Sequence, residues 1–454
     1  YECFSIFILF IYKQHIKRLY SLKLNLNIKN KILFFYIFTN KTNNMDIPNS
    51  MKYALRKSQS VDATTILRQF ASGNGSSFDT ATNEIRINVS ADGFLDGSKS
   101  YLYFTIKNKN GSAGQNLILD SDALCWVDQI RIESQGAVLE RIERCGVYNN
   151  VLGKYRSGLG KVQARNGKCG GPPQAANMSL NGEAVVENTQ LTVACPIPSG
   201  FLHGHMGRAI PQGTNFDIVI RVNSVAAQCF KWQSAGNTSF TIENPRFYAP
   251  VYRVNNPDVM GDYGAALMER GISWSGDVAK TYINSVSAGT GPQPLQINDR
   301  SESLKSLVSV MRGTTTTVSA TANSQSTSIL TGLTEMRYVI AGQNYPQDSV
   351  LYSATDSGRL YEEAQKALAT GNQTHCEPNV SSTNFNSTDG IMAVDLRKFD
   401  DESLSMTGLN TAATASPNLL HLQLTGAVAS ELVTFAICEA VFTLDGRGSV
   451  SVRT

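Results

Sequence analysis

The sequence predicts an all-β protein made of two tandem eight-stranded jelly-roll β-sandwiches, with short helices in the loops. Only 17% of the 454 residues are charged and 42% are hydrophobic, a balance that suits β-rich proteins with many Ser, Thr, Asn and Gly turns. About eight strand-like segments fall in residues 76–254 and about eight more in residues 271–454. Both halves end on a long aromatic-rich stretch, FYAPVYRV and FAICEAVFTL. Two sandwiches in tandem are the simplest account of this repetition.

Residues 1–44 differ in composition from the rest of the chain. They are rich in Ile, Phe, Leu, Lys and Asn and contain no Met. The apolar runs at residues 5–12 and 32–38 are far shorter than the roughly 20 residues that a membrane-spanning helix needs. We expect residues 1–44 to be a leader outside the fold, with the true start at Met45; a signal peptide is the alternative.

Residues 45–75 are polar with a few apolar anchors, and they carry a small basic cluster of Lys52, Arg56 and Lys57. We expect an N-terminal arm that lies along a neighbouring subunit or faces an anionic interior. The alternative is a frayed chain end with a short helix at residues 63–70.

The strand pattern of the first half begins where Ile85, Ile87 and Val89 alternate with polar residues, the period-2 signature of a strand with one buried face. Further predicted strands cover residues 101–106, 116–119, 126–134, 137–142, 191–196, 216–222, 241–242 and 247–254. Residues 148–155 predict a helix. The weakly periodic residues 156–190, rich in Gly, Pro and Asn, predict a long surface loop.

Residues 255–270 predict a linker or a short helix, after which the strand pattern resumes. Predicted strands of the second half cover residues 271–274, 281–283, 295–297, 304–311, 391–396, 418–424, 432–444 and 449–452. Residues 314–331 and 369–389 are polar and predict loops, and residues 361–368 predict a short helix. Residue identity between the halves is too low to prove a duplication.

One stretch of the second half, EMRYVIAGQNYPQDSV at residues 335–350, combines a strand with a turn. Alternation around Tyr338 predicts a strand that Gly342 ends. We expect Tyr345-Pro346 to form a rigid turn, because Pro fixes its own φ and restricts the residue before it. The layout is that of scaffolding and not of a catalytic centre.

His203 and His205 form the only close histidine pair in the sequence. Two imidazoles at this spacing on a strand would point to one face and suit a metal, provided that a third ligand converges. Gly204 and the preceding Ser-Gly place the pair in a loop instead, and no carboxylate is near in sequence. Asp400, Asp401 and Glu402 form an acidic run that would suit a cation, although a solvated turn is the plainer interpretation.

The residue patterns of common enzymes and nucleic-acid binders are missing from the sequence. It contains no GxSxG elbow, no Cys/His/Asn signature and no GxxxxGK[ST] loop. A net charge of +3 without basic patches between aromatic residues argues against a nucleic-acid-coating surface. We therefore predict no enzyme activity, no catalytic, cofactor-binding or metal-binding residues and no cofactor.

The cysteines and the glycosylation motifs give information on the cellular compartment of the protein. The eight cysteines, without CxxC or Cys/His ligand spacing, are Cys3, Cys125, Cys145, Cys169, Cys195, Cys229, Cys376 and Cys438. This scatter predicts buried or free thiols in a reducing compartment, with disulfides as the alternative. The N-x-[ST] motifs, which we expect to be unused, begin at Asn88, Asn110, Asn177, Asn237, Asn372, Asn379 and Asn386.

Four stretches carry a resemblance to a known family. They are SADGFLDGSKSYLYFTI (90–106), WVDQIRIESQGAVLERIERCGVYNNVL (126–152), MRYVIAGQNYPQDSV (336–350) and LVTFAICEAVFTLDGRGSVSV (432–452). Each pattern is weak alone, but all four occur in the expected order. Together they resemble the double jelly-roll major capsid proteins of the adenovirus-type lineage, most closely those of Polinton-like viruses, adintoviruses and virophages.

The resemblance implies a structural role in a virion. Two jelly rolls would stand side by side, and three chains would form a pseudo-hexagonal capsomer of an icosahedral shell. Loops 156–190 and 369–389 would form outer towers, and the arm after Met45 would face the inside, with possible weak contact to genome or inner-shell components. Penton and minor capsid proteins would be further partners. The alternatives are a secreted or cell-surface tandem β-sandwich binding protein and a tandem β-sandwich enzyme such as a glycosidase or a cupin-like oxygenase.

Overall fold

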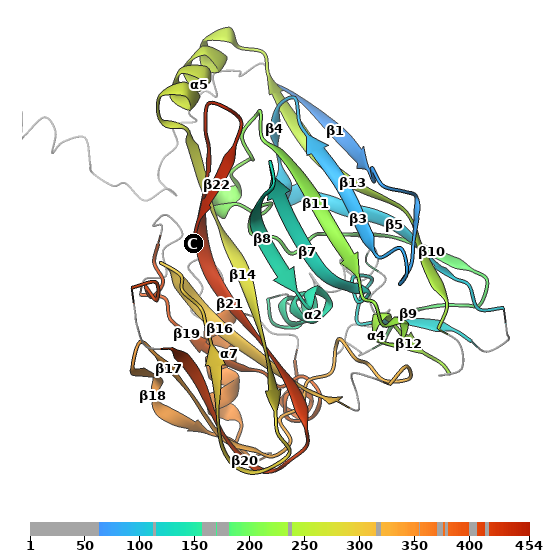
Figure 1. Cartoon of the computed structure of the whole chain (residues 1–454), viewed down its shortest axis with the longest axis vertical. Coiled ribbons are helices and arrows are strands. Elements are labelled where there is room, and N and C mark those ends of the chain that lie inside the picture. The colour runs from blue at the N-terminus through green and yellow to red at the C-terminus, as the bar shows by residue number, and fades with distance from the viewer. Residues whose placement is uncertain are drawn as a thin grey trace, which may run out of the picture. The chain divides into compact units, whose positions relative to one another are not determined.

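Each half of the chain folds into a sandwich of two antiparallel sheets (Figure 1). The computed structural model describes residues 63–454 except 112–114, 157–168, 170–180, 235–237, 315–318, 354, 370–375, 377–379, 399–405 and 414–416. The described residues belong to one compact unit. The predicted leader and the basic cluster of the arm therefore lie outside the described residues.

The first sandwich has eight main strands in two sheets. One sheet has the order β1-β13-β5-β10, formed by Ala63–Ala71, Phe240–Val254, Tyr101–Asn108 and Gln190–Cys195. The other has the order β3-β11-β7-β8, formed by Glu84–Ser90, Asn215–Val222, Val127–Ser134 and Ala137–Glu143. Numbered along the chain, the eight strands pair in the orders 1-8-3-6 and 2-7-4-5, which define a jelly roll of two interleaved Greek keys.

The second sandwich repeats this topology strand for strand. One sheet has the order β14-β21-β16-β19, formed by Ile272–Val286, Ser430–Leu444, Leu304–Gly313 and Met392–Asp395. The other has the order β15-β20-β17-β18, formed by Gly289–Ile297, Asn418–Ala427, Leu333–Ile340 and Gln343–Leu351. The orders are again 1-8-3-6 and 2-7-4-5. The predicted fold class, two tandem eight-stranded jelly rolls, is confirmed.

The register of the strands repeats as well. The eighth strand has 15 residues in both sandwiches. Its last residue lies opposite the first residue of the first strand, since Ala63 pairs with Val254 and Ile272 pairs with Leu444. The two sandwiches thus share a common frame despite their unlike sequences, so that an edge strand or helix in one has a defined counterpart in the other.

Short elements complete the fold. The minor strands are β2 (Ser77–Phe78), β4 (Phe94–Leu95), β6 (Leu117–Asp120), β9 (Asn181–Val185), β12 (Lys231–Trp232) and β22 (Val450–Arg453). The helices are α2 (Cys145–Tyr155), α4 (Ala226–Cys229), α5 (Pro257–Arg270), α7 (Gly358–Leu368) and α8 (Ser382–Ser387). Two 3₁₀ turns lie at Gly97–Lys99 (η2) and His205–Gly207 (η3). No helix of the described part is long and apolar enough to cross a membrane.

The helix α5 occupies the predicted linker between the sandwiches. Its first turn is fixed by Asn256, whose side chain accepts the Asp258 N–H at 3.0 Å, and by Pro257 in the first turn. Gly271 ends the helix with φ = 72°, a conformation that costs glycine little. None of its residues is buried, so that α5 joins the sandwiches without being part of either core.

Each core consists of the inward-facing residues of its two sheets, and Tyr338 shows how the layers of the second sandwich join. Its side chain is fully buried on β17, and its hydroxyl lies 3.0 Å from both the Ser309 hydroxyl on β16 and the Met392 carbonyl on β19. In the first sandwich Phe104 packs edge-to-face on Trp126 at 5.2 Å between ring centroids.

Four details of the sequence predictions are wrong. The helix at residues 63–70, which belonged to the alternative interpretation of the arm as a frayed chain end, is instead the strand β1, and this strand lies inside the range assigned to the arm. Residues 271–274 and 281–283 belong to one continuous strand, β14. The rigid turn expected at Tyr345-Pro346 lies within the strand β18, and the chain reverses at Ala341 and Gly342 instead. The predicted loop 156–190 contains the strand β9.

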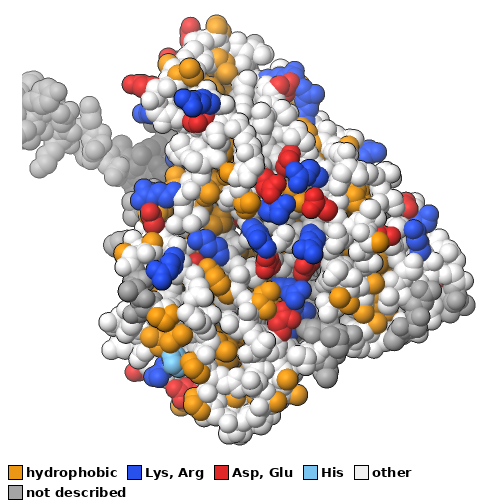
Figure 2. Space-filling model, in the orientation of Figure 1, with side chains coloured by type: hydrophobic (Ala, Val, Ile, Leu, Met, Phe, Trp, Pro, Cys, Tyr) orange, Lys and Arg blue, Asp and Glu red, His pale blue; other side chains and the backbone are white. Residues whose placement is uncertain are grey.

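The outward face of the sheet β3-β11-β7-β8 is charged and internally paired (Figure 2). Arg86 lies 3.2 Å from Asp217, and Arg131 lies 2.5 Å from Glu133. Such exposed pairs add little stability, but they keep the sheet face polar.

Candidate functional site

The candidate functional site is the junction between the two sandwiches, where an edge strand of the first sandwich lies beside an edge strand of the second. β8 is the outer strand of its sheet and lies next to β14, the outer strand of a sheet in the second sandwich (Figure 1). The Glu143 N–H donates to the Thr281 hydroxyl at 3.2 Å, and this hydroxyl donates to the Glu143 carbonyl at 3.1 Å. The Gln135 amide donates to the Gly448 carbonyl at 3.2 Å. Hydrogen bonds between side chains and backbone groups therefore hold the two sandwiches together at these edges.

The helix α2, which follows β8, is buried at this junction, with ten of its eleven residues buried. The Lys154 side chain is 2% exposed, and its ammonium lies 2.6 Å from the Asp389 carboxylate and 2.7 Å from the Ser326 carbonyl. Tyr155 donates its hydroxyl to the Asp389 carbonyl at 2.7 Å. Because Ser326 and Asp389 belong to the second sandwich, these bonds fasten α2 across the junction.

Two further polar contacts cross the junction. The buried Asp120 carboxylate accepts the Gln325 N–H at 2.5 Å and the Ser326 hydroxyl. Burial raises the pKa of Asp120, although the bonds from Ser326 and Gln325 oppose the rise. Arg144, next to α2, donates to Glu431 on β21 at 3.0 Å. Buried and hydrogen-bonded charges of this kind make a junction costly to rearrange.

Close approach of two backbones also fixes the junction. A Cβ atom placed on Gly200 would lie 2.0 Å from the Asp277 carbonyl, and one placed on Gly276 would lie 2.0 Å from the Gly200 carbonyl. Neither position has room for a larger residue, because a backbone carbonyl cannot rotate away as a side chain can. The loop before η3 therefore packs directly on β14.

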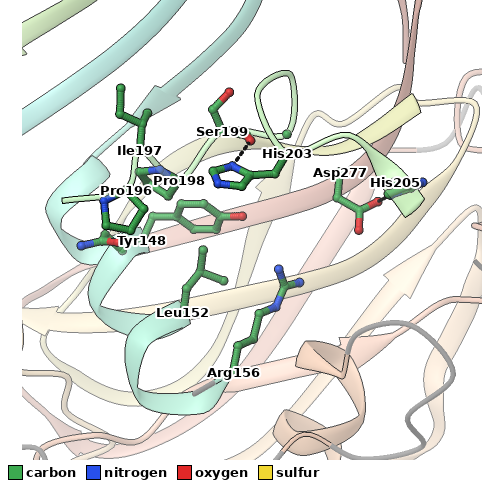
Figure 3. A pocket seen from close by; sticks show the side chains of 12 residues that line it. Tyr148, Leu152, Arg156, Pro196, Ile197, Pro198, Ser199, His203, His205 and Asp277 are labelled. Atoms are coloured by element: carbon green, nitrogen blue, oxygen red, sulfur yellow. Dashed lines mark hydrogen bonds and ion pairs between the residues drawn. The ribbon is translucent and has the colours of Figure 1, made fainter. Parts of the chain in front are cut away.

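A pocket of about 440 Å³ opens beside this loop (Figure 3). The lining residues are Tyr148, Asn149, Leu152, Arg156, Pro196, Ile197, Pro198, Ser199, Gly200, His203, His205 and Asp277. Tyr148 packs on Phe435 of the second sandwich at 5.0 Å between ring centroids. Burial raises the pKa of Tyr148. The lining contains one serine, Ser199, and no histidine is positioned as its base, since His203 meets the Ser199 backbone carbonyl and not the hydroxyl.

The predicted histidine pair lies in this loop, as expected, but its two rings serve different partners (Figure 3). His203 Nδ1 is 2.8 Å from the Ser199 carbonyl oxygen. His205 Nε2 is 3.0 Å from the Asp277 carboxylate, which β14 supplies from far along the chain. Among the residues that the structure describes, no group of three His, Cys, Asp or Glu is arranged to hold a metal ion.

Two carboxylates hold opposite ends of the loop, and their pKa values shift in opposite directions. Glu140 on β8 accepts the Gly200 N–H at 2.9 Å and the Phe201 N–H at 3.2 Å. Burial raises its pKa, and these hydrogen bonds only partly offset that effect. Burial would also raise the pKa of Asp277, but the hydrogen bond from His205 and the Lys305 ammonium at 2.8 Å hold it well below the usual range.

The remaining sequence candidates do not gather at a site. Asp400, Asp401 and Glu402 lie outside the described residues, as does Cys3. The seven described cysteines are buried, as predicted. Of the glycosylation motifs in the described part, Asn88 is exposed, Asn110 is buried and Asn386 is half-buried. The other four lie outside it.

Sequence analysis missed the junction residues Lys154, Asp389 and Asp120. One signal was present, because Lys154 is the only charged residue in the helical stretch CGVYNNVLGKY. A lone Lys in a neutral helix favours either a snorkelling side chain or a buried ion pair. The identity of its partner, 235 residues away, has no local signature.

Comparison with known proteins finds the same architecture in solved structures whose titles name viral capsids. No family model and no curated protein matches the sequence. The structure is similar to a chain of the PBCV-1 virus capsid, with a TM-score of 0.60 and 10% identity over 86% of this chain and 97% of that chain. The Faustovirus major capsid protein gives 0.58 and 10% over 84% and 90%, and the Sputnik virophage structure gives 0.50 and 13% over 86% and 88%. The shared feature is the fold, along nearly the full length of both chains.

Proposed function

We propose that the chain is a viral major capsid protein, three copies of which form a pseudo-hexagonal capsomer that tiles an icosahedral shell. One observation carries the proposal: the strand orders 1-8-3-6 and 2-7-4-5 occur twice in one chain, in an architecture that covers 97% of a PBCV-1 capsid chain. Two equivalent sandwiches per chain give six in a trimer, so that three identical copies present a nearly six-fold outline.

The junction suits a rigid building block. A tile must keep a fixed angle between its two sandwiches, and here the buried Lys154–Asp389 pair, the Asp120 contacts and the glycine approach at Gly200 and Gly276 all oppose movement. The function would then reside in surfaces and interfaces, and not in a single pocket.

The secreted binding-protein alternative receives less support. It requires disulfides or glycans to stabilise the sandwiches outside the cell. The seven described cysteines are buried, and Cys125, Cys145, Cys229, Cys376 and Cys438 are free thiols. The Asn110 side chain is fully buried, where a glycan has no room.

Further parts of the proposal concern partners and place. The chain would be a virion component that contacts its own copies first, then neighbouring capsomers, penton proteins and minor capsid proteins. Residues 45–62, which carry Lys52, Arg56 and Lys57, would face the interior of the shell, where weak contact with the genome or inner components is electrostatically favourable. Loops 156–190 and 369–389 would face outward.

The test is the solution mass of residues 45–454, measured by light scattering, followed by electron microscopy of the same peak. The expected result is a trimer with a pseudo-hexagonal outline, or spontaneous shells. A stable monomer at the concentrations of shell assembly, or a chain with oxidised cysteines, would overturn the proposal.

A further inference from the structure

We propose that the pocket between α2 and residues 196–200 binds a small organic carboxylate with an apolar chain, and that the Arg156 guanidinium receives the carboxylate. This binding site goes beyond the proposed capsid function and does not rest on it, because every group that would hold the ligand belongs to a single chain.

One wall of the pocket is a face of α2. Tyr148, Leu152 and Arg156 line it at a spacing of four residues, which places their side chains on the same side of the helix. The Tyr148 ring packs on Phe435 and Leu152 is half-buried, so that this part of the wall is apolar and fixed. Figure 3 shows the Arg156 guanidinium and the Tyr148 hydroxyl pointing into the same space.

The other wall is a stiff apolar segment that consists of Pro196, Ile197 and Pro198 (Figure 3). A proline fixes its own φ, restricts the residue before it and has no N–H. Ile197 is buried, and both prolines are half-buried. This wall therefore has a defined shape before a ligand arrives, and its few hydrogen-bond donors suit an apolar chain better than a polar one.

Two donors in the pocket lack a partner within the described part of the chain. Arg156 Nε donates to the Leu368 carbonyl of α7 at 3.2 Å, which positions the guanidinium and leaves its two Nη groups without a bond to a described residue. The Tyr148 side chain is only 4% exposed, and its hydroxyl also bonds no described residue. Because buried polar groups in proteins nearly always have a hydrogen-bond partner, these donors point to a ligand with acceptor oxygens.

The charges around the pocket favour a ligand with one negative charge. Asp277 also lines the pocket, but its carboxylate is already held by Lys305 at 2.8 Å and by His205 at 3.0 Å. Arg156 forms no ion pair with a described residue. One unpaired guanidinium matches one carboxylate, and its two Nη groups fit the two carboxylate oxygens. A phosphate dianion would leave a charge unmatched.

The size of the pocket fits a small molecule. Its volume of about 440 Å³ lies within the roughly 300–1,000 Å³ that small-molecule sites occupy, and such sites combine apolar walls with a few converging polar groups. The C-terminus of a peptide offers the same carboxylate, but its backbone would bring N–H and C=O groups that the wall at residues 196–198 has few groups to pair with.

The direct test is calorimetric titration of the full chain with octanoate, and with octanol as the neutral probe of the same chain length. We expect one octanoate site per chain. Octanol should bind at least about tenfold more weakly, because only the carboxylate forms charge-assisted hydrogen bonds with Arg156.

Variants of the chain locate the binding. Arg156→Gln should weaken octanoate binding about tenfold or more and leave octanol binding unchanged. Tyr148→Phe keeps the ring against Phe435 and should weaken octanoate binding by about threefold to tenfold. Leu152→Trp fills the pocket and should abolish the binding of both probes. The matched control is Arg447→Gln, which should change nothing, since Arg447 is exposed in the turn after β21 and does not line the pocket.

Three results would overturn the proposal. They are the absence of octanoate binding, an equal octanoate affinity of the wild type and Arg156→Gln, and an equal loss of affinity in Arg156→Gln and Arg447→Gln, which would mean that surface charge alone attracts the anion. None of them affects the capsid proposal, because the titration measures binding within one chain, whereas light scattering measures the association of chains.

Discussion

The helices α2 and α7 have the same position in the order of elements of the two sandwiches, but their surroundings differ. Each follows the fifth strand and has eleven residues. Ten residues of α2 are buried, whereas four of α7 are buried. The second sandwich covers α2, whereas α7 packs on β19 and β16 of its own sandwich and touches α2, where the Arg156 guanidinium donates to the Leu368 carbonyl at 3.2 Å. The comparison teaches that helices at the same position in the repeat are buried to different extents, because one lies inside the junction and the other lies on its own sandwich.

The first strands differ in the same sense. β14 has 15 residues and extends along the whole length of β21, while β1 has nine residues and covers only the end of β13. β14 lies between its own sheet and β8, and β1 has a partner on one side only within the described part. Equivalent first strands of the two sandwiches therefore differ in length and in the number of strands beside them.

The largest expected effect comes from removing the buried charge of the internal junction. Lys154→Met leaves Asp389 buried without its partner, which should cost about 3–5 kcal/mol of unfolding free energy. The matched variant on the other helix is Lys366→Met, because Lys366 lies 3.6 Å from Glu362 in an exposed pair and should change stability by less than about 1 kcal/mol. Urea unfolding measures both, and equal shifts would mean that the two helices are not differently engaged.

A smaller loss of stability is expected from placing a side chain where the backbones of Gly276 and Gly200 are in close contact. Gly276→Ala places a Cβ atom against the Gly200 carbonyl, and the resulting overpacking should cost about 1–3 kcal/mol or more. Gly264→Ala in α5 is the control, since its Cβ meets no atom within 4 Å and alanine favours a helix by about 1 kcal/mol. The thermal midpoints should move in opposite directions. A neutral Gly276→Ala would show that the loop is free to move away from β14.

The side-chain hydrogen bonds between β8 and β14 should contribute still less to the free energy of unfolding. Thr281→Val removes the hydroxyl that bonds the Glu143 backbone twice, at an expected cost of about 1 kcal/mol. Thr105→Val is the comparison, because the Thr105 hydroxyl bonds only the exposed Thr192 hydroxyl at 2.9 Å and should matter by less than about 0.5 kcal/mol. Denaturant midpoints of both variants test the difference. If Thr281→Val costs no more than the control, the junction does not depend on this bond.

The strands could be predicted from the sequence where one face is buried and the other is not. Ile85, Ile87 and Val89 have this pattern, and β3 forms there. The alternative interpretation of residues 63–70 as a short helix is wrong because the half-buried face of β1 consists of Ile66, Arg68 and Phe70, so that a charged residue interrupts the apolar period-2 pattern.

The junction was beyond the reach of sequence patterns for a different reason. Its residues come from segments far apart in the sequence, and a charged residue gives no sign of the charge that it will meet. The local sequence around His205 lacks a carboxylate, yet folding brings Asp277 to 3.0 Å from it. The pairing of Lys154 with Asp389 likewise depends on how two finished sandwiches dock. The periodicity of apolar residues determines which segments form strands and helices. The docking of the two sandwiches depends on surfaces that exist only after each sandwich has folded.

The smallest expected effect is a change in the pH dependence of stability. It comes from Glu140 and Asp277, the two carboxylates that hold the loop at residues 199–205. The raised pKa of Glu140 means that its contribution to stability is fully present below the ordinary value of about 4.3 and is lost as pH rises through the folded pKa. The lowered pKa of Asp277 means the opposite: its contribution is present above about 3.9 and is lost as pH falls toward the folded pKa.

Two conservative variants separate these contributions. Relative to Glu140→Gln, the wild type should lose stability as pH rises from about 4 toward neutrality, because the variant has no proton to lose. Relative to Asp277→Asn, the wild type should lose its advantage as pH falls below about 4. Urea midpoints measured across this pH range give both slopes. If the urea midpoints of the wild type and of Glu140→Gln change in parallel with pH, the pKa of Glu140 is not perturbed by its contact with the loop. Of these two carboxylates, Asp277 of the second sandwich would then be the only one that makes the stability of the junction depend on pH.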